Sequence, residues 1–152
     1  MMIFFTGPDV SGKNSLMHEV AKNYNYRYFM SPRSPICNIV YDKLYRKTTH
    51  QENYSLIKDF LNLNAYFVLI KVEPRILEQR ALARNEQHVK TIDDFKKHIK
   101  VFKEVFDDCK KRFGEGHFIE VDNSGTLSLT AFTLGDILNN KDKMAKFYST
   151  KG

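Results

Sequence analysis

The sequence predicts an α/β fold in which a parallel sheet is covered by helices on both faces. Apolar runs of strand length alternate along the 152 residues with segments whose apolar side chains recur at helical spacing. Residues 65–72, AYFVLIKV, are almost continuously apolar, as expected for a strand buried on both faces. We expect about four to five strands, with ligands at their carboxyl ends.

The first half of the chain begins with a strand, a loop and a helix. Residues 2–6 are a short apolar run that ends at a glycine, which is typical of a buried strand, and residues 14–23 show a helical pattern. A second strand is expected at residues 26–30. Residues 31–35 contain two prolines and predict a loop. The next helices are expected at residues 36–46 and 54–63.

The second half continues the alternation. Pro74 follows the apolar strand and can open a helix, which we expect to run to about Asn85. Residues 91–113 predict a long amphipathic helix with a capping sequence at its start. A last strand at 117–121, a turn at 122–125 and a helix at 127–138 complete the prediction. We therefore expect one domain over residues 1–138 and a polar, lysine-rich, frayed tail over residues 139–152.

Composition narrows the possible partners. The net charge of +6 suits anionic partners such as nucleotides or nucleic acid, although a solvated basic surface is the alternative. Cys37 and Cys109 lie far apart in the sequence and have no metal-ligand spacing, which favours a reduced, cytoplasmic protein. We expect no signal peptide, no transmembrane helix and no membrane partner, because no apolar run has the necessary length.

The N-terminal stretch IFFTGPDVSGKNS carries the clearest chemical motif. A strand, a loop bounded by Gly7 and Gly12, and a helix follow in the order that a phosphate-binding loop requires. The glycines let backbone amides face one anion, the helix adds its positive end, and Lys13 can reach the outer phosphates. The alternative is an ordinary strand-to-helix turn. The residues expected to bind a nucleoside triphosphate are Gly7, Pro8, Asp9, Val10, Ser11, Gly12, Lys13, Asn14 and Ser15.

Asn14 departs from this motif, which has Ser or Thr at that position. The usual hydroxyl ligates Mg²⁺, which prefers oxygen donors. The amide oxygen of Asn14 can bind the metal directly or through water, whereas Ser15 is expected to point about 100° away around the helix. We predict retained nucleotide binding with weakened or altered coordination of Mg²⁺ by Asn14.

With this loop, the chain resembles P-loop nucleoside monophosphate kinases, and the thymidylate kinase-like branch in particular. Four segments are similar to that branch and stand in its order: GPDVSGK, SPRSPICNIVY, VLIKVEPRILEQRALAR and FIEVDNSGTLS. The resemblance implies a three-layer P-loop NTPase fold. It also implies that Asp9 contacts the acceptor sugar or phosphate, that Arg33 binds the acceptor phosphate with Ser34 beside it, and that Tyr41 lies near the acceptor base.

The third segment resembles the strand and helix that lead into the mobile lid of the family. Arg80 and Arg84 then match lid arginines that close over the transferring phosphoryl group. Each assignment has an alternative: Arg80 and Arg84 can form surface pairs with neighbouring glutamates, and Arg33 can be a solvent-facing loop residue. Likewise, Asp9 can cap its turn and Tyr41 can belong to the core.

Two departures from the family change the expected site. Pro32 stands where the family has an aspartate, so a carboxylate near the metal is missing. About 20 residues separate Lys13 from Arg33, which is much shorter than the family's connection. We therefore expect about four strands and a more open acceptor pocket.

The predicted function is a compact, virus-type nucleotide kinase that uses ATP and Mg²⁺. It would transfer the γ-phosphoryl group of ATP to a (deoxy)nucleoside monophosphate, in the cytoplasm or a host cytoplasm, with Lys13, Arg33, Arg80 and Arg84 as catalytic residues. The resemblance also suggests a homodimer. Two alternatives remain open: a kinase that acts on a nucleotide within DNA or on a polynucleotide end, and a nucleotide-binding protein whose kinase site has decayed.

Overall fold

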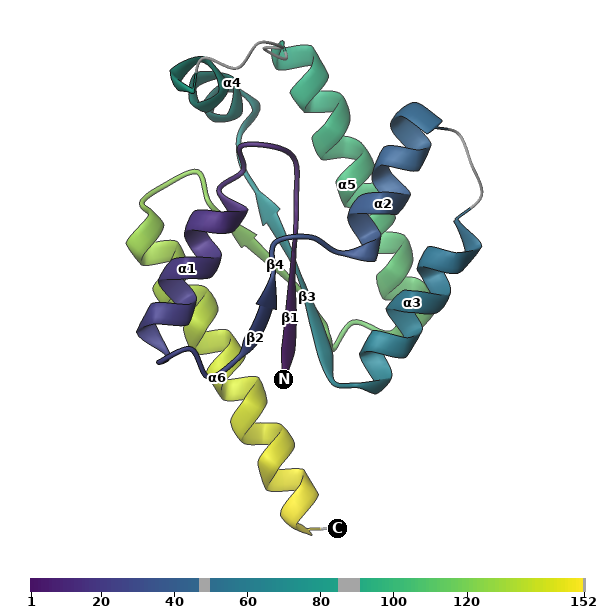
Figure 1. Ribbon diagram of the computed structural model, residues 1–152, viewed down its shortest axis with the longest axis vertical. Coiled ribbons are helices and arrows are strands. Elements are labelled where there is room, and N and C mark those ends of the chain that lie inside the picture. The colour runs from purple at the N-terminus through teal and green to yellow at the C-terminus, as the bar shows by residue number, and fades with distance from the viewer. Residues whose placement is uncertain (47–49, 85–90, 152) are drawn as a thin grey trace.

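The computed structural model describes residues 1–46, 50–84 and 91–151, and within them the predicted α/β fold is confirmed. The described strands form one parallel sheet in the order β2-β1-β3-β4 (Figure 1). Their bounds are β1 Met2–Thr6, β2 Phe29–Ser31, β3 Ala65–Lys71 and β4 Phe118–Asp122. The sheet therefore has the smaller number of strands that the short connection after Lys13 predicts.

Helices cover both faces of this sheet. Figure 1 shows α1 (Lys13–Asn23) and α6 (Leu127–Lys151) on one face, and α2 (Pro35–Tyr41), α3 (Gln51–Asn62) and α5 (Ile92–Phe113) on the other. Strand side chains alternate between the two layers, as the pleat requires: Val68 packs in the core under α1 and α6, and Phe67 in the core under α2, α3 and α5. Two further helical elements are described: the π-helical turn η1 (Asp42–Arg46), which follows α2, and α4 (Pro74–Ala83), which follows β3.

The second strand begins later than the sequence pattern indicates. Asn25 and Tyr26 both have positive φ angles, 54° and 55°, and the amide of Tyr26 donates a hydrogen bond to the carbonyl of Ala21 at 2.7 Å. This tight turn ends α1 and occupies residues that were expected to be extended. The strand predicted at residues 26–30 is therefore wrong at its start, and β2 is the short segment Phe29–Ser31.

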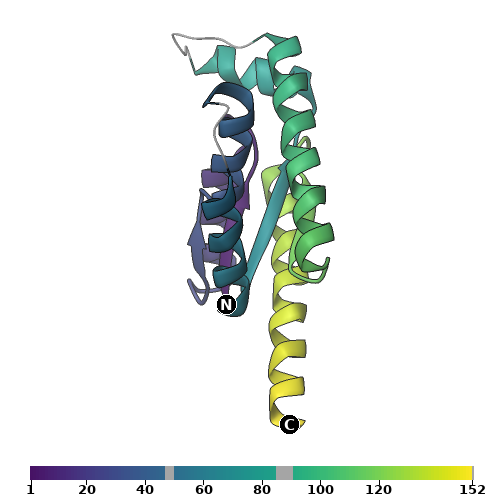
Figure 2. The same cartoon turned by 90° about the vertical axis from the view of Figure 1, so that its right-hand side faces the viewer.

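The last helix is longer than predicted. Instead of ending at Leu138, α6 continues to Lys151 and projects beyond the amino ends of the strands (Figures 1 and 2). No Gly or Pro interrupts residues 139–151, and an ion pair between Lys146 and Asp142 (3.3 Å) spans one helical turn. The prediction of a frayed segment there is wrong, whereas the division into a domain and a tail stays a prediction.

Both ends of α5 are as predicted, whereas the predicted end of the helix that begins at Pro74 lies outside the described residues. Thr91 and Asp94 form a reciprocal capping box at the start of α5, and Gly114, with φ 87°, ends that helix. The expected end of the helix at Asn85, and the lid expected after it, fall among residues that the structure does not describe. None of the described helices combines the length and the apolar character needed to cross a bilayer.

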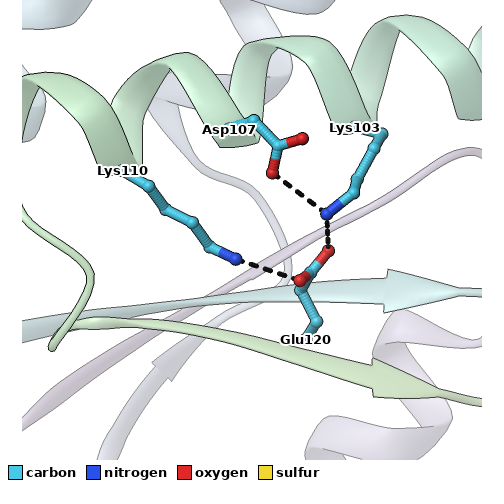
Figure 3. Close-up of polar contacts among 4 residues, drawn as sticks. All are labelled: Lys103, Asp107, Lys110 and Glu120. Atoms are coloured by element: carbon cyan, nitrogen blue, oxygen red, sulfur yellow. Dashed lines mark hydrogen bonds and ion pairs between the residues drawn. The ribbon is translucent and has the colours of Figure 1, made fainter.

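A charged cluster ties the edge strand β4 to α5. The carboxylate of Glu120 accepts hydrogen bonds from Lys103 (2.6 Å) and Lys110 (3.0 Å), and Lys103 also contacts Asp107 at 3.0 Å (Figure 3). Burial by itself raises the pKa of the Glu120 carboxyl, but the hydrogen bonds and the positive charges of Lys103 and Lys110 together outweigh burial and lower its pKa. Because the folded-state pKa is lowered, the cluster stabilises the fold above the unfolded pKa, and this contribution is lost as pH falls through the folded pKa.

The substitution Glu120→Gln is expected to lower the free energy of unfolding by about 1–2 kcal/mol at pH 7, because it removes the charge that both lysines share. The difference from the wild type should narrow only as the pH falls below the ordinary range of a glutamate and through the lowered pKa of Glu120. Urea denaturation at several pH values measures this, with Glu104→Gln at an exposed position of α5 as the control. A difference that does not change with pH would contradict the proposed role of the charge.

Candidate active site

A cleft of about 650 Å³ lies at the carboxyl ends of the strands. Its size is in the range of small-molecule sites. The loop between β1 and α1 forms one wall, α2 with η1 forms another, and the end of α4 contributes Arg84. The lining residues are Gly7, Asp9, Val10, Ser11, Gly12, Lys13, Asn14, Ser15, Pro32, Arg33, Cys37, Asn38, Tyr41, Arg46 and Arg84.

The β1–α1 loop has the backbone shape of an anion nest. Gly12 has φ 89° and Val10 has φ 58°, which is a strained angle for a β-branched residue. Helix α1 begins directly after Gly12, so its first amides have no partner within the helix. The ammonium of Lys13 donates hydrogen bonds to the carbonyls of Gly7 (2.6 Å) and Pro8 (3.0 Å). Positive charge and backbone amides thus meet at one position of the cleft.

Arg80 and Asn123 hold this loop from the side away from the cleft. The guanidinium of Arg80 donates hydrogen bonds to the carbonyls of Val10 (3.4 Å), Ser11 (3.2 Å) and Asn123 (2.8 Å). The side-chain amide of Asn123 donates to the carbonyl of Ser11 at 2.9 Å. Burial and the neighbouring Arg84 lower the pKa of Arg80, although an arginine stays charged. We name Arg80 and Asn123 the loop brace.

Two buried polar atoms at this loop lack a hydrogen-bond partner among the described residues. They are the hydroxyl oxygen of Ser11 and the side-chain oxygen of Asn123. Buried polar atoms are normally paired in folded proteins, by protein groups or by ordered water. Of the two residues, only Ser11 lines the cleft, so its hydroxyl is the one that a polar ligand in the cleft could reach.

The wall formed by α2 contributes Tyr41 opposite Asp9. The hydroxyl of Tyr41 donates a hydrogen bond to the Asp9 carboxylate at 3.4 Å, and burial together with Asp9 raises the pKa of Tyr41. Tyr41 is therefore a protonated donor at neutral pH. Its ring is fixed by a stacked contact with Tyr45 and an edge contact with Phe102. Asp9 and Tyr41, which the sequence places far apart, lie together in the cleft.

Three of the predicted site residues, Pro8, Ser34 and Arg80, do not line the cleft. Arg80 belongs to the loop brace, and its expected contact with the transferring phosphoryl group stays a prediction. Ser34 is buried, where its hydroxyl bonds Thr6 Oγ1 (2.8 Å) and accepts from the amide of Cys37 (3.4 Å). Ser34 thereby caps α2, and its expected role in acceptor binding stays a prediction.

The sequence analysis missed the lining residues Asn38 and Arg46, and it missed Asn123 of the loop brace. Asn38 and Tyr41 are separated by three positions on α2, so helical spacing indicates that they share a face. Arg46 gave no comparable signal, because regular helical spacing from Tyr41 would direct it elsewhere. Asn123 was quoted within a segment but given no role, since only the fold brings it to the β1–α1 loop.

The donor atoms in the cleft fit a metal held mainly by a nucleotide. Asn14 is exposed and lines the cleft, and Ser15, which was expected to point away, lines it as well. Among the lining residues that the structure describes, Asp9 is the only acidic one, and no described group of three or more His, Cys, Asp or Glu residues is placed to hold a metal. Mg²⁺ keeps several waters and binds phosphates with few protein ligands, so this sparse set is compatible with it.

Comparison with solved structures supports the fold. The YorR protein of Bacillus subtilis, in complex with phosphorylated GDP, aligns over 94% of this chain and 98% of its own, with a TM-score of 0.74 and 14% identity. A gluconokinase from Sinorhizobium meliloti 1021 aligns over 99% of this chain and 97% of its own, with a TM-score of 0.51 and 14% identity. No protein-family model matches the sequence, and no curated protein matches it. The likeness shows a P-loop kinase fold; the thymidylate kinase-like branch stays a prediction.

The substitution Gly12→Ala is expected to destroy the nest. A Cβ atom at Gly12 would lie 2.5 Å from the side-chain nitrogen Nδ2 of Asn123, and φ 89° is unfavourable for alanine. We expect a loss of about 1–3 kcal/mol in stability and a drop of at least ~10-fold in ATP affinity, measured by denaturation and calorimetric titration.

The control for this substitution is Gly125→Ala, since nothing lies within 4 Å of a Cβ at that position. If Gly12→Ala binds ATP as tightly as the wild type does, the nest is not the nucleotide site.

Proposed function

We propose that this chain transfers the γ-phosphoryl group of ATP to a nucleoside monophosphate, as the resemblance to thymidylate kinase-like enzymes implies. The observation that carries the proposal is one cleft in which a phosphate nest faces a wall bearing arginines. The crystallised YorR protein holds a phosphorylated guanine nucleotide on the same fold, which supports a nucleotide ligand here.

In this proposal, one side of the cleft binds the phosphates of the donor and the other binds the phosphate of the acceptor. Lys13 and the loop amides hold the donor phosphates, and Arg33 binds the acceptor phosphate with a planar fork that suits two oxygens. Arg84 lines the same cleft, which supports a role in neutralising the charge that spreads over the transferring group. When bound, Mg²⁺ supplies further charge neutralisation at the donor phosphates, with Asn14 as its nearest expected protein ligand.

The scarcity of carboxylates among the described lining residues favours a phosphate acceptor over a hydroxyl acceptor. A hydroxyl must lose a proton to a base, whereas a phosphate monoester is already a nucleophile at neutral pH. The only carboxylate among the described lining residues, Asp9, accepts a hydrogen bond from Tyr41. A sugar kinase activity like that of the gluconokinase neighbour is therefore less well supported than a monophosphate kinase activity.

Two other functions retain specific support. The net charge of +6 and the short connection between α1 and β2 favour a kinase that accepts a nucleotide within DNA or a polynucleotide end. Asn14 and Pro32, which replace two groups near the expected metal, favour a nucleotide-binding protein without turnover. Homodimer formation remains a proposal from the resemblance.

An acceptor panel with labelled ATP tests these functions. The wild type is expected to phosphorylate at least one nucleoside monophosphate, and Lys13→Ala should weaken ATP binding by about 10–100-fold because a charged phosphate contact is lost. Lys22→Ala, an exposed lysine at the other end of α1, is the control. Labelled oligonucleotide with inert monophosphates would favour the polynucleotide kinase. Tight ATP binding without any product, at every Mg²⁺ or Mn²⁺ concentration, would favour the decayed site.

The substitution Asn14→Ser tests the metal. Restoring the hydroxyl is expected to lower the Mg²⁺ concentration needed for half-maximal activity severalfold, because a hydroxyl in this position of the loop is the usual ligand. Asn23→Ser, an exposed residue at the far end of α1, is the matched control. Unchanged Mg²⁺ dependence and turnover would show that Asn14 has no role at the metal.

A further inference from the structure

We propose that the open edge of β4 is an interface between two copies of this chain, in which the two β4 strands pair antiparallel about Glu120 and join two sheets into one. The hydrogen-bonding groups, the charges and the apolar side chains at this edge all fit a second copy of the same edge. Residues 118–122 do not line the cleft, so the inference goes beyond the proposed function.

The outer side of β4 has no neighbouring strand among the described residues, because β4 is the last strand in the sheet order. On its inner side, the amide of Asn123 donates a hydrogen bond to the carbonyl of Lys71 in β3 at 2.8 Å. Parallel strands use alternate residues for such bonds, so Phe118, Glu120 and Asp122 direct their backbone groups to the open edge. Edges of this kind are templates for pairing with another chain.

The outward backbone groups are symmetric about Glu120. The amide of Phe118 donates to the carbonyl of Glu115 (3.1 Å), and the carbonyl of Asp122 accepts from Oγ1 of Thr130 (3.2 Å). Among the described residues, no partner is found for the amide and carbonyl of Glu120, the carbonyl of Phe118 or the amide of Asp122. If Glu120 stands opposite Glu120 of a second copy, Phe118 stands opposite Asp122, and each remaining donor meets a remaining acceptor.

The charges on the α5 side of this edge are already balanced. Two glutamates directly opposite each other would repel if their charge were uncompensated. The Glu120 carboxylate instead lies between the ammonium groups of Lys103 (2.6 Å) and Lys110 (3.0 Å), and Lys103 also contacts Asp107 at 3.0 Å (Figure 3). With two lysines and two carboxylates, the cluster brings no net charge to the pairing axis, so an identical cluster can approach it.

On the α6 side, a hollow of about 380 Å³ lies beside the edge of β4 and is lined by Glu120 and Val121 of the strand and by Leu129 and Thr133 of the helix, among others. Leu129 is 66% exposed, and so is Phe132, three positions along the helix. Residues three apart share a helix face, so Phe132 extends the apolar surface next to the edge. A symmetric contact would remove this surface from water in both copies at once.

Sedimentation equilibrium of the full chain without nucleotide tests the interface. The wild type is expected to show twice the mass of one chain. Leu129→Lys should raise the dissociation constant of the dimer at least ~10-fold, because it places an ammonium group against the strand of the second copy. Leu63→Lys, at a leucine of similar exposure (64%) at the end of α3, is the matched control and should leave the dimer intact. Both leucines are exposed, and circular dichroism checks that each variant folds.

Disulfide cross-linking tests the register. Opposite residues of a hydrogen-bonded antiparallel pair have Cα atoms about 5.5 Å apart, which a disulfide can span. Glu120→Cys should therefore give a covalent dimer under mild oxidation, whereas Glu52→Cys, at an exposed position of α3, should not. The native Cys37 and Cys109 are buried and should not cross-link.

A wild type that stays monomeric at every concentration overturns the inference. A dimer that survives Leu129→Lys, that is broken by Leu63→Lys, or that is not cross-linked by Glu120→Cys uses another surface, and this also overturns it. Neither experiment contains a nucleotide. Failure of phosphoryl transfer would therefore leave the interface standing, and failure of the interface would leave the proposed function standing.

Discussion

The shape of the β1–α1 loop is the constraint on which the rest of this site depends. The loop has strained φ angles at Val10 and Gly12, and an isolated peptide would not keep them. Arg80 from α4 and Asn123 from the end of β4 bind the carbonyls of Val10 and Ser11 from the side away from the cleft. With its carbonyls held in this way, the loop can direct amides toward the cleft. The shape of the nest therefore depends on the β1–α1 loop itself, on Arg80 of α4 and on Asn123 after β4.

The side chains that line the cleft carry mostly positive charge. The described cationic lining residues are Lys13, Arg33, Arg46 and Arg84; Asp9 is the carboxylate among the described lining residues, and Arg46 also pairs with Asp42. These like charges repel one another in the empty cleft, and a bound anion such as polyphosphate relieves that repulsion. The charge distribution therefore favours anion binding. Phosphoryl transfer needs mainly positioning and charge neutralisation, which this set of side chains can supply without a dedicated base.

The connection between α1 and β2 is short, and the helices that follow β2 form one wall of the cleft. With only residues 24–28 between these elements, α2 and η1 stand directly beside the cleft. The packing of α2 against α3 and α5 fixes this wall, through buried residues such as Ile36, Ile39 and Phe102. A wall held by a continuous core can present Tyr41 in a defined direction.

The sequence by itself determined the strand–loop–helix at the N-terminus, the strand β3 with its buried apolar run and the capping box of α5, because local spacing and composition encode each of them. It also indicated the smaller sheet, through the length of the chain between Lys13 and Arg33. The tertiary structure alone decided that Arg80 and Asn123 brace the loop, that Ser34 is buried as a cap, and that a π-helical turn brings Arg46 to the cleft. These outcomes depend on which residues meet across elements far apart in the chain, and no periodicity within one segment carries that information.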